Sequence, residues 1–206
     1  MKTTDLQLSR ILSYILHPLL IPTLAISALM LRPGLYSIVL PPALKLWFLS
    51  LVIVFTLVIP SAAVFVLFKL NAIYSVELTH RGERTIPLLI ASASYMALVF
   101  FMKSVNLPPV FLYVLYSATI ALLAGLLINM VYKISLHTLG WSAVATTLLS
   151  ISLHMGIPLP GLISIAVILS GLAGYARLKE NAHNQTQVYL GYIAGASIVM
   201  IITLLV

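Results

Sequence analysis

Long apolar runs separated by short polar segments fill the chain. A helix that crosses a bilayer core of about 30 Å needs about 20 residues, and the runs are of that order. Proline, glycine and charged residues mark the connections between them. The pattern predicts seven membrane spans, at about Leu8–Leu31, Leu44–Leu70, Ile86–Lys103, Val110–Tyr132, Thr138–Leu153, Pro158–Tyr175 and Val188–Val206.

The composition agrees with this pattern, since 62% of the residues are hydrophobic and only 7% are charged. A soluble domain of this size does not carry so much apolar surface. In lipid, a long uncharged run must hydrogen-bond its own backbone N–H and C=O groups, and it does so by forming a helix. We therefore expect an all-α, polytopic transmembrane bundle of six to seven spans, forming one domain over residues 1–206. The first run is longer than a signal-peptide core, so we interpret it as a retained first helix.

The net charge of +7 favours an anionic partner. Nucleic acid is a poor fit, because the chain has no basic helix and no platform of aromatic and basic residues. Anionic lipid or a phosphorylated head group fits better. The G-x-x-x-G spacing of Gly191 and Gly195 indicates close helix packing, which we expect inside the chain. An oligomer would use the same spacing, but nothing else in the sequence supports one.

The order of the spans determines which polar segments share a side of the membrane. Two spans separate the first polar cluster from the second, and two more separate the second from the third. The three clusters therefore face one side: Glu77–Arg84, Lys133–His137 and Arg177–His183. Eight of the 11 Lys and Arg residues lie on that side, which the positive-inside rule would make cytoplasmic. Four of them can serve a ligand instead, which leaves the orientation open: Arg81, Arg84, Lys133 and Arg177.

The third cluster lies in the longest strongly polar run, from Ala176 to Gln187. Its Arg177 and His183 are a pair that can bind a phosphate and attack it. Taken alone, the run also fits a solvated loop. What favours a site is that two other clusters reach the same side.

The second cluster stands where the fifth span begins, and a helix N-terminus attracts anions. Lys133 offers a point charge, Ser135 a hydroxyl, and His137 a proton for a leaving oxygen. The alternative is that Ser135 only caps the helix and His137 is an interfacial polar residue. The same four letters recur at Ile151–His154, about 25 Å further along the helix. His154 therefore belongs to the opposite interface, and we interpret it as structural.

The first cluster precedes the third span. Arg84 carries a planar fork that matches phosphate oxygens. The alternative is a positive interfacial anchor with Glu83 as its local partner. In the first span, His17 stands beside Pro18, and we expect it to hydrogen-bond a carbonyl freed by the proline.

In this order, the three clusters resemble the type 2 phosphatidic acid phosphatase superfamily of membrane lipid phosphatases. The third motif of that family is S-R, five residues, H, three residues, D. This chain has Ala176-Arg177, five residues, His183, three residues and Gln187, so the spacing is the same. The second motif is P-S-G-H, which corresponds to Ile134–His137 here. The first motif, K, six residues, R-P, is represented by Arg84 and Pro87, with Glu77 in place of the lysine.

The resemblance implies a function and a set of roles. The implied reaction is metal-independent hydrolysis of a lipid phosphate or isoprenoid diphosphate, without a cofactor, in a prokaryotic plasma membrane. His183 would attack phosphorus and form a phosphohistidine, and His137 would protonate the leaving group. Cations and a hydroxyl would hold the phosphoryl oxygens: Arg81, Arg84, Lys133, Ser135 and Arg177.

One departure from the family motif concerns the nucleophile. Gln187 replaces the aspartate that orients the imidazole, and a glutamine oxygen accepts the ring N–H without adding charge. Glu180 or Glu83 are candidate substitutes. The departure favours a rival function, a non-catalytic relative that binds lipid phosphate. A small membrane transporter is a second rival, which only His17 in the first span fits.

Overall fold

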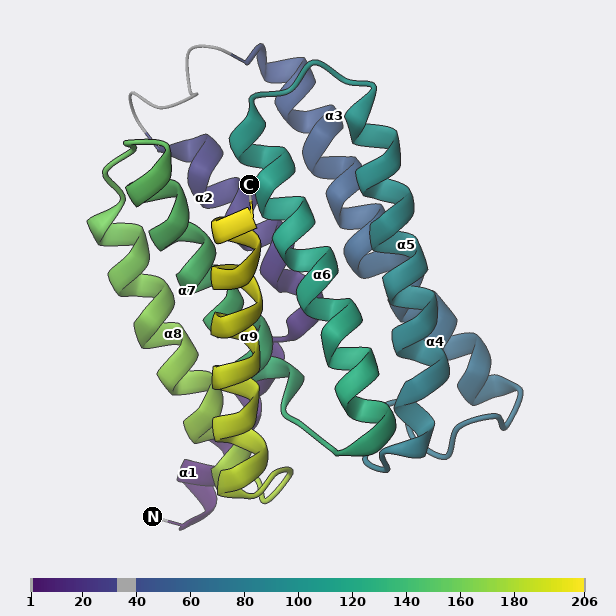
Figure 1. The fold of residues 1–206 in the computed structure, drawn as a ribbon. Coiled ribbons are helices and arrows are strands. Elements are labelled where there is room, and N and C mark those ends of the chain that lie inside the picture. Colours follow the sequence, from purple (N-terminus) through teal and green to yellow (C-terminus); the bar gives the residue numbers. More distant parts are fainter. Residues whose placement is uncertain (1, 33–39, 206) are drawn as a thin grey trace.

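The computed structural model describes residues 2–32 and 40–205, with side chains from Asp5 onward. Over these ranges the regular elements are helical and no strand is present. The elements are α1 (Lys2–Ile15), η1 (Pro18–Leu20), α2 (Ile21–Leu31), α3 (Pro42–Ile53), η2 (Val54–Val58), α4 (Ile59–Lys69), η3 (Gly82–Arg84), α5 (Thr85–Lys103), α6 (Pro109–Val131), α7 (Leu136–His154), α8 (Pro160–Lys179) and α9 (Gln185–Leu205). Seven helical segments in the described ranges are long and apolar enough to cross a membrane (Figure 1), which confirms the all-α polytopic bundle.

Each predicted span coincides with one of these segments, although most boundaries differ by a few residues, and the third segment begins at Gly82 instead of Ile86. The sixth segment continues to Lys179 instead of ending at Tyr175, and the seventh begins at Gln185 instead of Val188. Helix hydrogen bonds continue into the interface without apolar side chains, so hydropathy underestimates the helices there. Arg177 consequently lies on α8, and only residues 180–184 connect α8 to α9. The predicted end at Val206 lies outside the described residues.

The first segment is interrupted at Pro18, which begins the short helix η1. The Nδ1 atom of His17 accepts a hydrogen bond from the Leu19 amide at 3.3 Å and so caps this turn. The prediction that His17 binds a freed carbonyl is wrong. A new helical turn leaves its first amides without carbonyl partners, so an acceptor is what the position needs.

The second segment contains a π-helical turn, η2, just before Pro60. Pro60 has no amide hydrogen to donate to the preceding turn. Two side chains of α5 bind carbonyls in that turn. The Ser94 hydroxyl donates to the Phe55 carbonyl at 2.6 Å, and the Tyr95 hydroxyl donates to the Thr56 carbonyl at 3.4 Å. Neighbouring helices thus compensate for an internal proline, as they do in other membrane bundles.

Two glycines bring α9 into close contact with α7. A Cβ atom on Gly191 would collide with the Thr138 hydroxyl and the Ser135 carbonyl, and one on Gly195 would collide with the Leu139 carbonyl. The predicted use of this spacing for packing inside the chain is confirmed. The contact matters for function because it holds the start of α9 against the start of α7.

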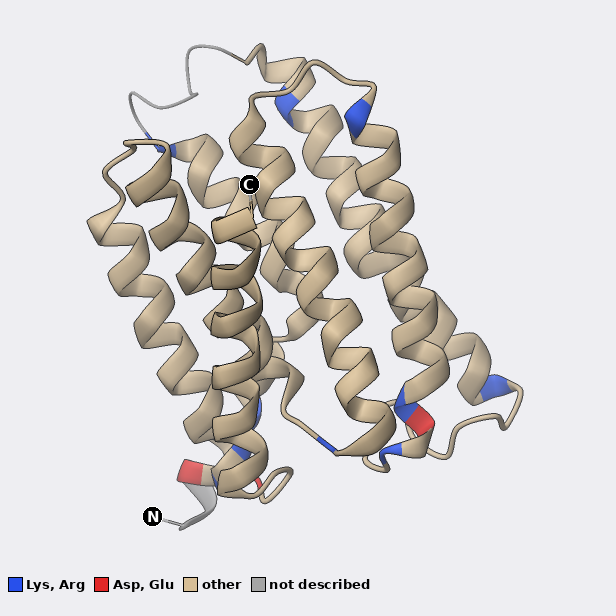
Figure 2. Cartoon of the chain, in the orientation of Figure 1, with Lys and Arg blue, Asp and Glu red and all other residues tan. Residues whose placement is uncertain are grey.

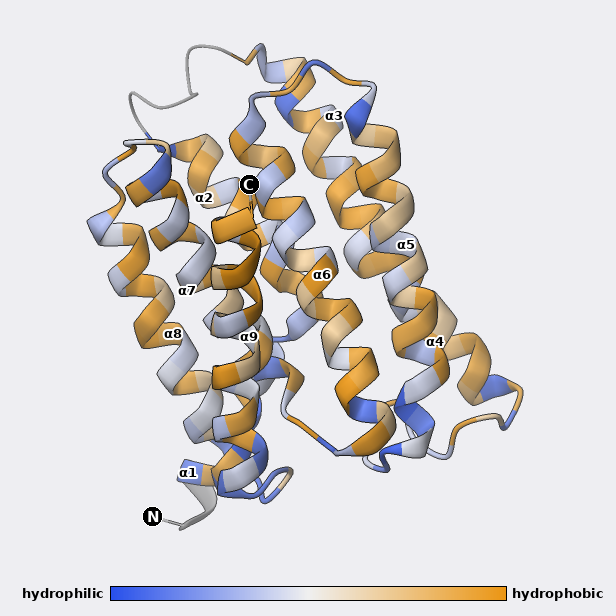
Figure 3. Ribbon diagram, in the orientation of Figure 1, coloured by the Kyte–Doolittle hydropathy of each residue, from blue (hydrophilic) through white to orange (hydrophobic). Residues whose placement is uncertain are grey.

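The core and the outer surface are both apolar. Ile26, Phe48 and Phe111 are fully buried, and the two phenylalanine rings pack edge to face with their centroids 5.6 Å apart. Large apolar side chains are also exposed on the outside, and Phe100 and Val131 are 80% and 81% exposed. Hydrophobic residues recur along the length of the helices (Figure 3). Such a surface is stable facing lipid and not facing water.

The three polar clusters lie at one end of the bundle, which we call the charged end. The loop before α5, the α6–α7 connection and the α8–α9 connection all reach it (Figure 1). Charged residues gather there and at the opposite end, with few between (Figure 2). The parity of the spans therefore predicted the placement of the clusters correctly.

Candidate functional site

Hydrogen bonds join the three polar clusters directly. Arg84 donates through one terminal nitrogen to the Ile134 carbonyl at 3.3 Å, which links the first cluster to the second. Lys133 donates to the Ala182 carbonyl at 3.2 Å, which links the second to the third. The Ser135 amide donates to the Gln187 carbonyl at 3.1 Å. Segments about 50 residues apart in sequence thus form one constellation.

A cavity of about 1020 Å³ opens between these clusters and the interior of the bundle. On α7 its lining residues run from Leu136 to Leu148, a rise of about 18 Å, or more than half of a bilayer core. The wall is charged at one end, with four cations and two acids: Arg10, Glu77, Arg84, Lys133, Arg177 and Glu180. Further in it is mostly apolar, with Ala25, Val114, Ala118 and Leu148. This arrangement suits an amphipathic ligand with an anionic head.

His183 enters the cavity from the turn before α9 and is held by Gln187. The ring Nδ1 lies 2.8 Å from Oε1 of Gln187, as predicted for the position of the family's aspartate. Because Oε1 only accepts, Nδ1 carries the hydrogen and Nε2 has a free lone pair. Burial and the neighbouring positive charge of Arg84 lower the pKa of His183 from 6.5 to about 3, against the opposing effect of Gln187. The imidazole is therefore neutral, and its Nε2 is available to attack an electrophile.

Arg84 is buried and held in one orientation by two carbonyls. Its Nε donates to the Leu78 carbonyl at 2.7 Å, in addition to the bond to Ile134. A guanidinium has five N–H donors, so these bonds leave others for a ligand. The side chain lines the cavity, and its position is fixed before a ligand binds.

Arg177 comes from the last turn of α8 and also faces the cavity. One terminal nitrogen contacts Glu180 at 2.8 Å and the Ser13 hydroxyl at 3.3 Å. Its Nε is buried without a hydrogen-bond partner in the described part of the chain. A buried, unpartnered N–H beside a cavity is suited to an anionic ligand.

Lys133 adds a third cation at the charged end. Burial lowers the pKa of its ammonium group, and the nearby charges of Arg84 and Arg177 lower it further. The two arginines thus repel the ammonium group, and a phosphate placed between the three cations would relieve that repulsion.

His137 contacts the first helix and not the other clusters. Its Nε2 lies 3.2 Å from the Ser13 carbonyl, which can only accept, so Nε2 carries the hydrogen. The ring also packs edge to face against His17, with centroids 5.6 Å apart. His137 lines the cavity, but helix α1 determines its tautomer.

Two residues expected to bind phosphate have other roles. Ser135 is fully buried and caps α7, accepting a hydrogen bond from the Thr138 amide at 3.4 Å, which is the alternative that the sequence left open. The Arg81 guanidinium binds the carbonyls of Met130 and Val131 at the end of α6. Neither residue lines the cavity. We therefore do not include them in the phosphate-binding set proposed below.

The two glutamates considered as partners of His183 are also engaged elsewhere. Glu180 pairs with Arg177, and Glu83 accepts the backbone amides of Tyr74 and His80 at 2.8 and 3.4 Å. Within the described ranges, the hydrogen-bond partner of the His183 ring is Gln187. His154 lies at the far end of α7 from the charged end, as predicted, where its Nδ1 contacts the Ser150 carbonyl at 3.3 Å.

Sequence reasoning missed the contribution of the first helix. Arg10, Ser13 and His17 all line the cavity. Their spacing of three and four residues places them on one face of a helix, in a run that is otherwise mostly apolar. That polar stripe is the signal that could have found them.

No group of three or more metal-binding side chains occurs in the described part of the chain. The cavity cations attract anions and repel a metal ion. Searches against protein-family models, curated proteins and solved structures found no match to this chain.

Proposed function

We propose that this protein is a membrane phosphatase that hydrolyses a lipid phosphate or an isoprenoid diphosphate through a phosphohistidine. The observation that carries the proposal is the state of His183, a neutral imidazole whose bare Nε2 belongs to a cavity shared with Arg84 and Arg177. The apolar depth of the cavity supports a lipid tail. Either substrate class fits the proposed location, a prokaryotic plasma membrane.

The reaction requires two displacements at phosphorus. First, Nε2 of His183 forms a bond to phosphorus, the bond to the leaving oxygen breaks, and that oxygen takes up a proton. Water then attacks phosphorus, the N–P bond breaks, and inorganic phosphate leaves. Phosphoryl transfer needs mainly positioned positive charge and an aligned nucleophile, which Arg84, Arg177, Lys133 and His183 supply.

A second candidate function is lipid-phosphate binding without turnover. Gln187 favours it, because the amide orients His183 but carries no negative charge to balance the positive charge that the ring acquires during attack. The same cations would bind the head group in either case. The two functions differ only in whether the N–P bond forms.

Phosphate release from phosphatidic acid and from an isoprenoid diphosphate, using detergent-solubilised protein, tests the proposal. We expect turnover by wild type and a loss of about 10⁴-fold or more in His183→Gln, as for other covalent nucleophiles. The matched control is His80→Gln, which changes an exposed histidine at the same end of the bundle. Acid-labile ³²P on wild type and not on His183→Gln would identify the intermediate. Binding without phosphate release would favour the second function, and full activity of His183→Gln would refute the first.

A further inference from the structure

His17 lines the cavity but belongs to none of the three polar clusters, and the reaction described above gives it no role. Its Nδ1 accepts the Leu19 amide hydrogen, so the neutral ring carries its own hydrogen on Nε2. In the described part of the chain Nε2 has no hydrogen-bond partner, and the residue lines the cavity. The structure therefore leaves a fixed N–H donor at the cavity wall.

The other two cavity histidines present the opposite polarity. His137 uses its Nε2–H on the Ser13 carbonyl, so Nδ1 is a bare acceptor. His183 uses its Nδ1–H on Gln187, so Nε2 is bare. Of these three neutral rings, His17 alone has a donor that is free for a ligand.

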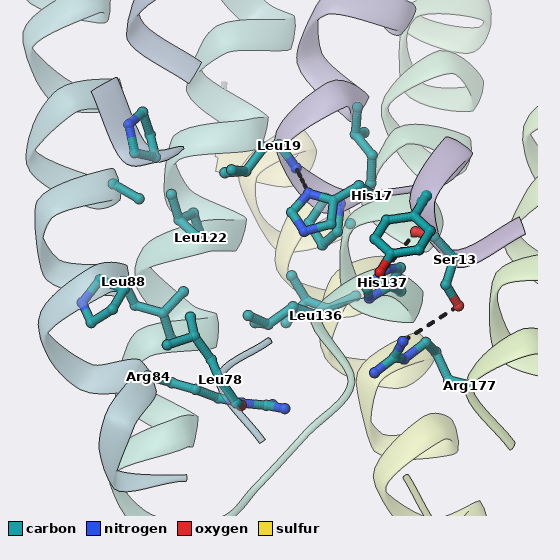
Figure 4. Close-up of a pocket in the computed structure, with 18 of the residues that line it drawn as sticks. Ser13, His17, Leu19, Leu78, Arg84, Leu88, Leu122, Leu136, His137 and Arg177 are labelled. Carbon is teal, nitrogen blue, oxygen red and sulfur yellow. Dashed lines mark hydrogen bonds between the residues drawn. The ribbon is translucent and has the colours of Figure 1, made fainter. Parts of the chain in front are cut away.

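The position of His17 indicates which ligand oxygen it meets. In Figure 4, Arg84 and Arg177 lie lowest, toward the charged end, His137 lies above Arg177, and His17 lies above His137. A phosphoryl group between the arginines would have its lipid tail on the side of His17, where the cavity becomes apolar. In an in-line displacement the leaving oxygen lies opposite the nucleophile, and that oxygen carries the tail.

We propose that His17 donates its Nε2 hydrogen bond to the leaving oxygen of the substrate. The inference rests on the proposed function, because only a substrate attacked by His183 has such an oxygen. His17 keeps its proton throughout: it stabilises the negative charge that develops on the oxygen as the P–O bond breaks. Proton delivery to the departed oxygen is a separate step, which His137 performs only after its bare Nδ1 has taken up a proton from water. Removing one preorganised donor of this kind costs a reaction about 10²–10³-fold in rate.

The substitution His17→Asn tests this role with little disturbance of the fold. The asparagine Oδ1 replaces Nδ1 as acceptor for the Leu19 amide, and asparagine is a good N-cap, whereas nothing replaces Nε2. The rate is measured on two phosphates with tails of equal length, one an alkyl ester and the other an alkyl-substituted nitrophenyl ester. A nitrophenolate spreads its charge over the ring and needs little stabilisation. We expect His17→Asn to lose about 10²-fold on the alkyl ester and less than about tenfold on the aryl ester.

A control and a pH profile complete the experiment. His154→Asn changes a histidine outside the cavity and should leave both rates unchanged. Because His17 does not transfer its proton, His17→Asn should lower the pH–rate profile of the alkyl ester without moving its limbs. Equal losses on the two esters, no loss on either, or a displaced limb would each overturn the role of His17 while leaving the phosphatase intact. A wild type that is inert on every phosphate would overturn both proposals.

Discussion

The sequence Ile-Ser-Leu-His occurs at both ends of α7, and the two copies have different surroundings. At Ile134–His137 the histidine lines the cavity and binds a carbonyl of α1, 124 residues away in sequence. At Ile151–His154 the histidine contacts the Ser150 carbonyl of its own helix. One imidazole is held by tertiary contacts and the other by local ones.

The difference shows that four residues do not make a site by themselves. The first copy lies where α7 begins, and a free helix start gives Ser135 an amide to cap. It also lies at the end of the bundle where the other two clusters converge. The second copy is about 25 Å away, too far to share a ligand with them. Helix direction and the parity of the spans therefore separate a candidate site from its repeat.

The largest effect is expected from placing a carboxylate beside a histidine ring, because neither copy of the Ile-Ser-Leu-His motif has one. In Gln187→Asp the new charge would stabilise His183 as it becomes positive during attack, and we expect faster phosphate release, by up to about 10⁴-fold. Gln185→Asp is the matched control, since it adds the same charge to an exposed position in the same helical turn. Equal gains in both variants would mean that the charge acts through the helix N-terminus and not through His183.

Substituting the two repeat histidines tests the comparison directly. We expect His137→Ala to lower kcat by at least about 10²-fold, because it removes a cavity group suited to acid catalysis, whereas His154→Ala should leave kcat within about twofold of wild type. Initial rates on phosphatidic acid measure both. Similar losses in the two variants would contradict the separation of the two ends.

The pH dependence of stability reports the burial of His183 at the charged end. Its pKa of about 3 lies below the ordinary 6.5, so between these values the unfolded chain binds more protons than the folded protein. Stability should therefore fall as pH decreases from 6.5, by about 2 kcal/mol at about pH 5. Urea unfolding in detergent measures the slope. The slope should flatten in His183→Gln and in Gln187→Asp, where the carboxylate raises the pKa of the ring; an unchanged slope would contradict the assignment.

Ser135 and Ser152, the serines of the two Ile-Ser-Leu-His copies, should differ by a smaller amount in what they contribute to stability. Ser135→Ala removes a buried cap and should lower the free energy of unfolding by about 1 kcal/mol. Ser152→Ala removes an acceptor for the Leu159 amide at 3.4 Å, in a connection at the other end, and should cost less. Neither change should alter KM or kcat, since Ser135 does not line the cavity. A rise in KM for Ser135→Ala would restore it to the phosphate-binding set.

Metal removal should have the smallest effect. The charged end supplies arginine and lysine donors, so phosphate release by wild type should be the same with and without EDTA. Assays in EDTA, with and without added Mg²⁺, measure this. A strict metal requirement would reject the proposed mechanism and leave the fold unaffected.

The sequence alone predicted the spans and the meeting of the three clusters, because both depend on local apolar composition and on counting. It also predicted the contact between His183 and Gln187, from the position that Gln187 takes in the motif that the chain resembles. These properties need no knowledge of which helix packs against which.

Only the tertiary structure decided which residues face the cavity. Ser135 and Arg81 bind backbone groups at helix ends, whereas Ser13 and His17 enter the site from a helix whose proximity to α7 no local pattern encodes. A side chain's hydrogen-bond partner depends on which helices pack together, and packing is a property of the whole bundle. The tautomers of His137 and His183 follow from those partners, so the direction of each N–H at the site is a tertiary property.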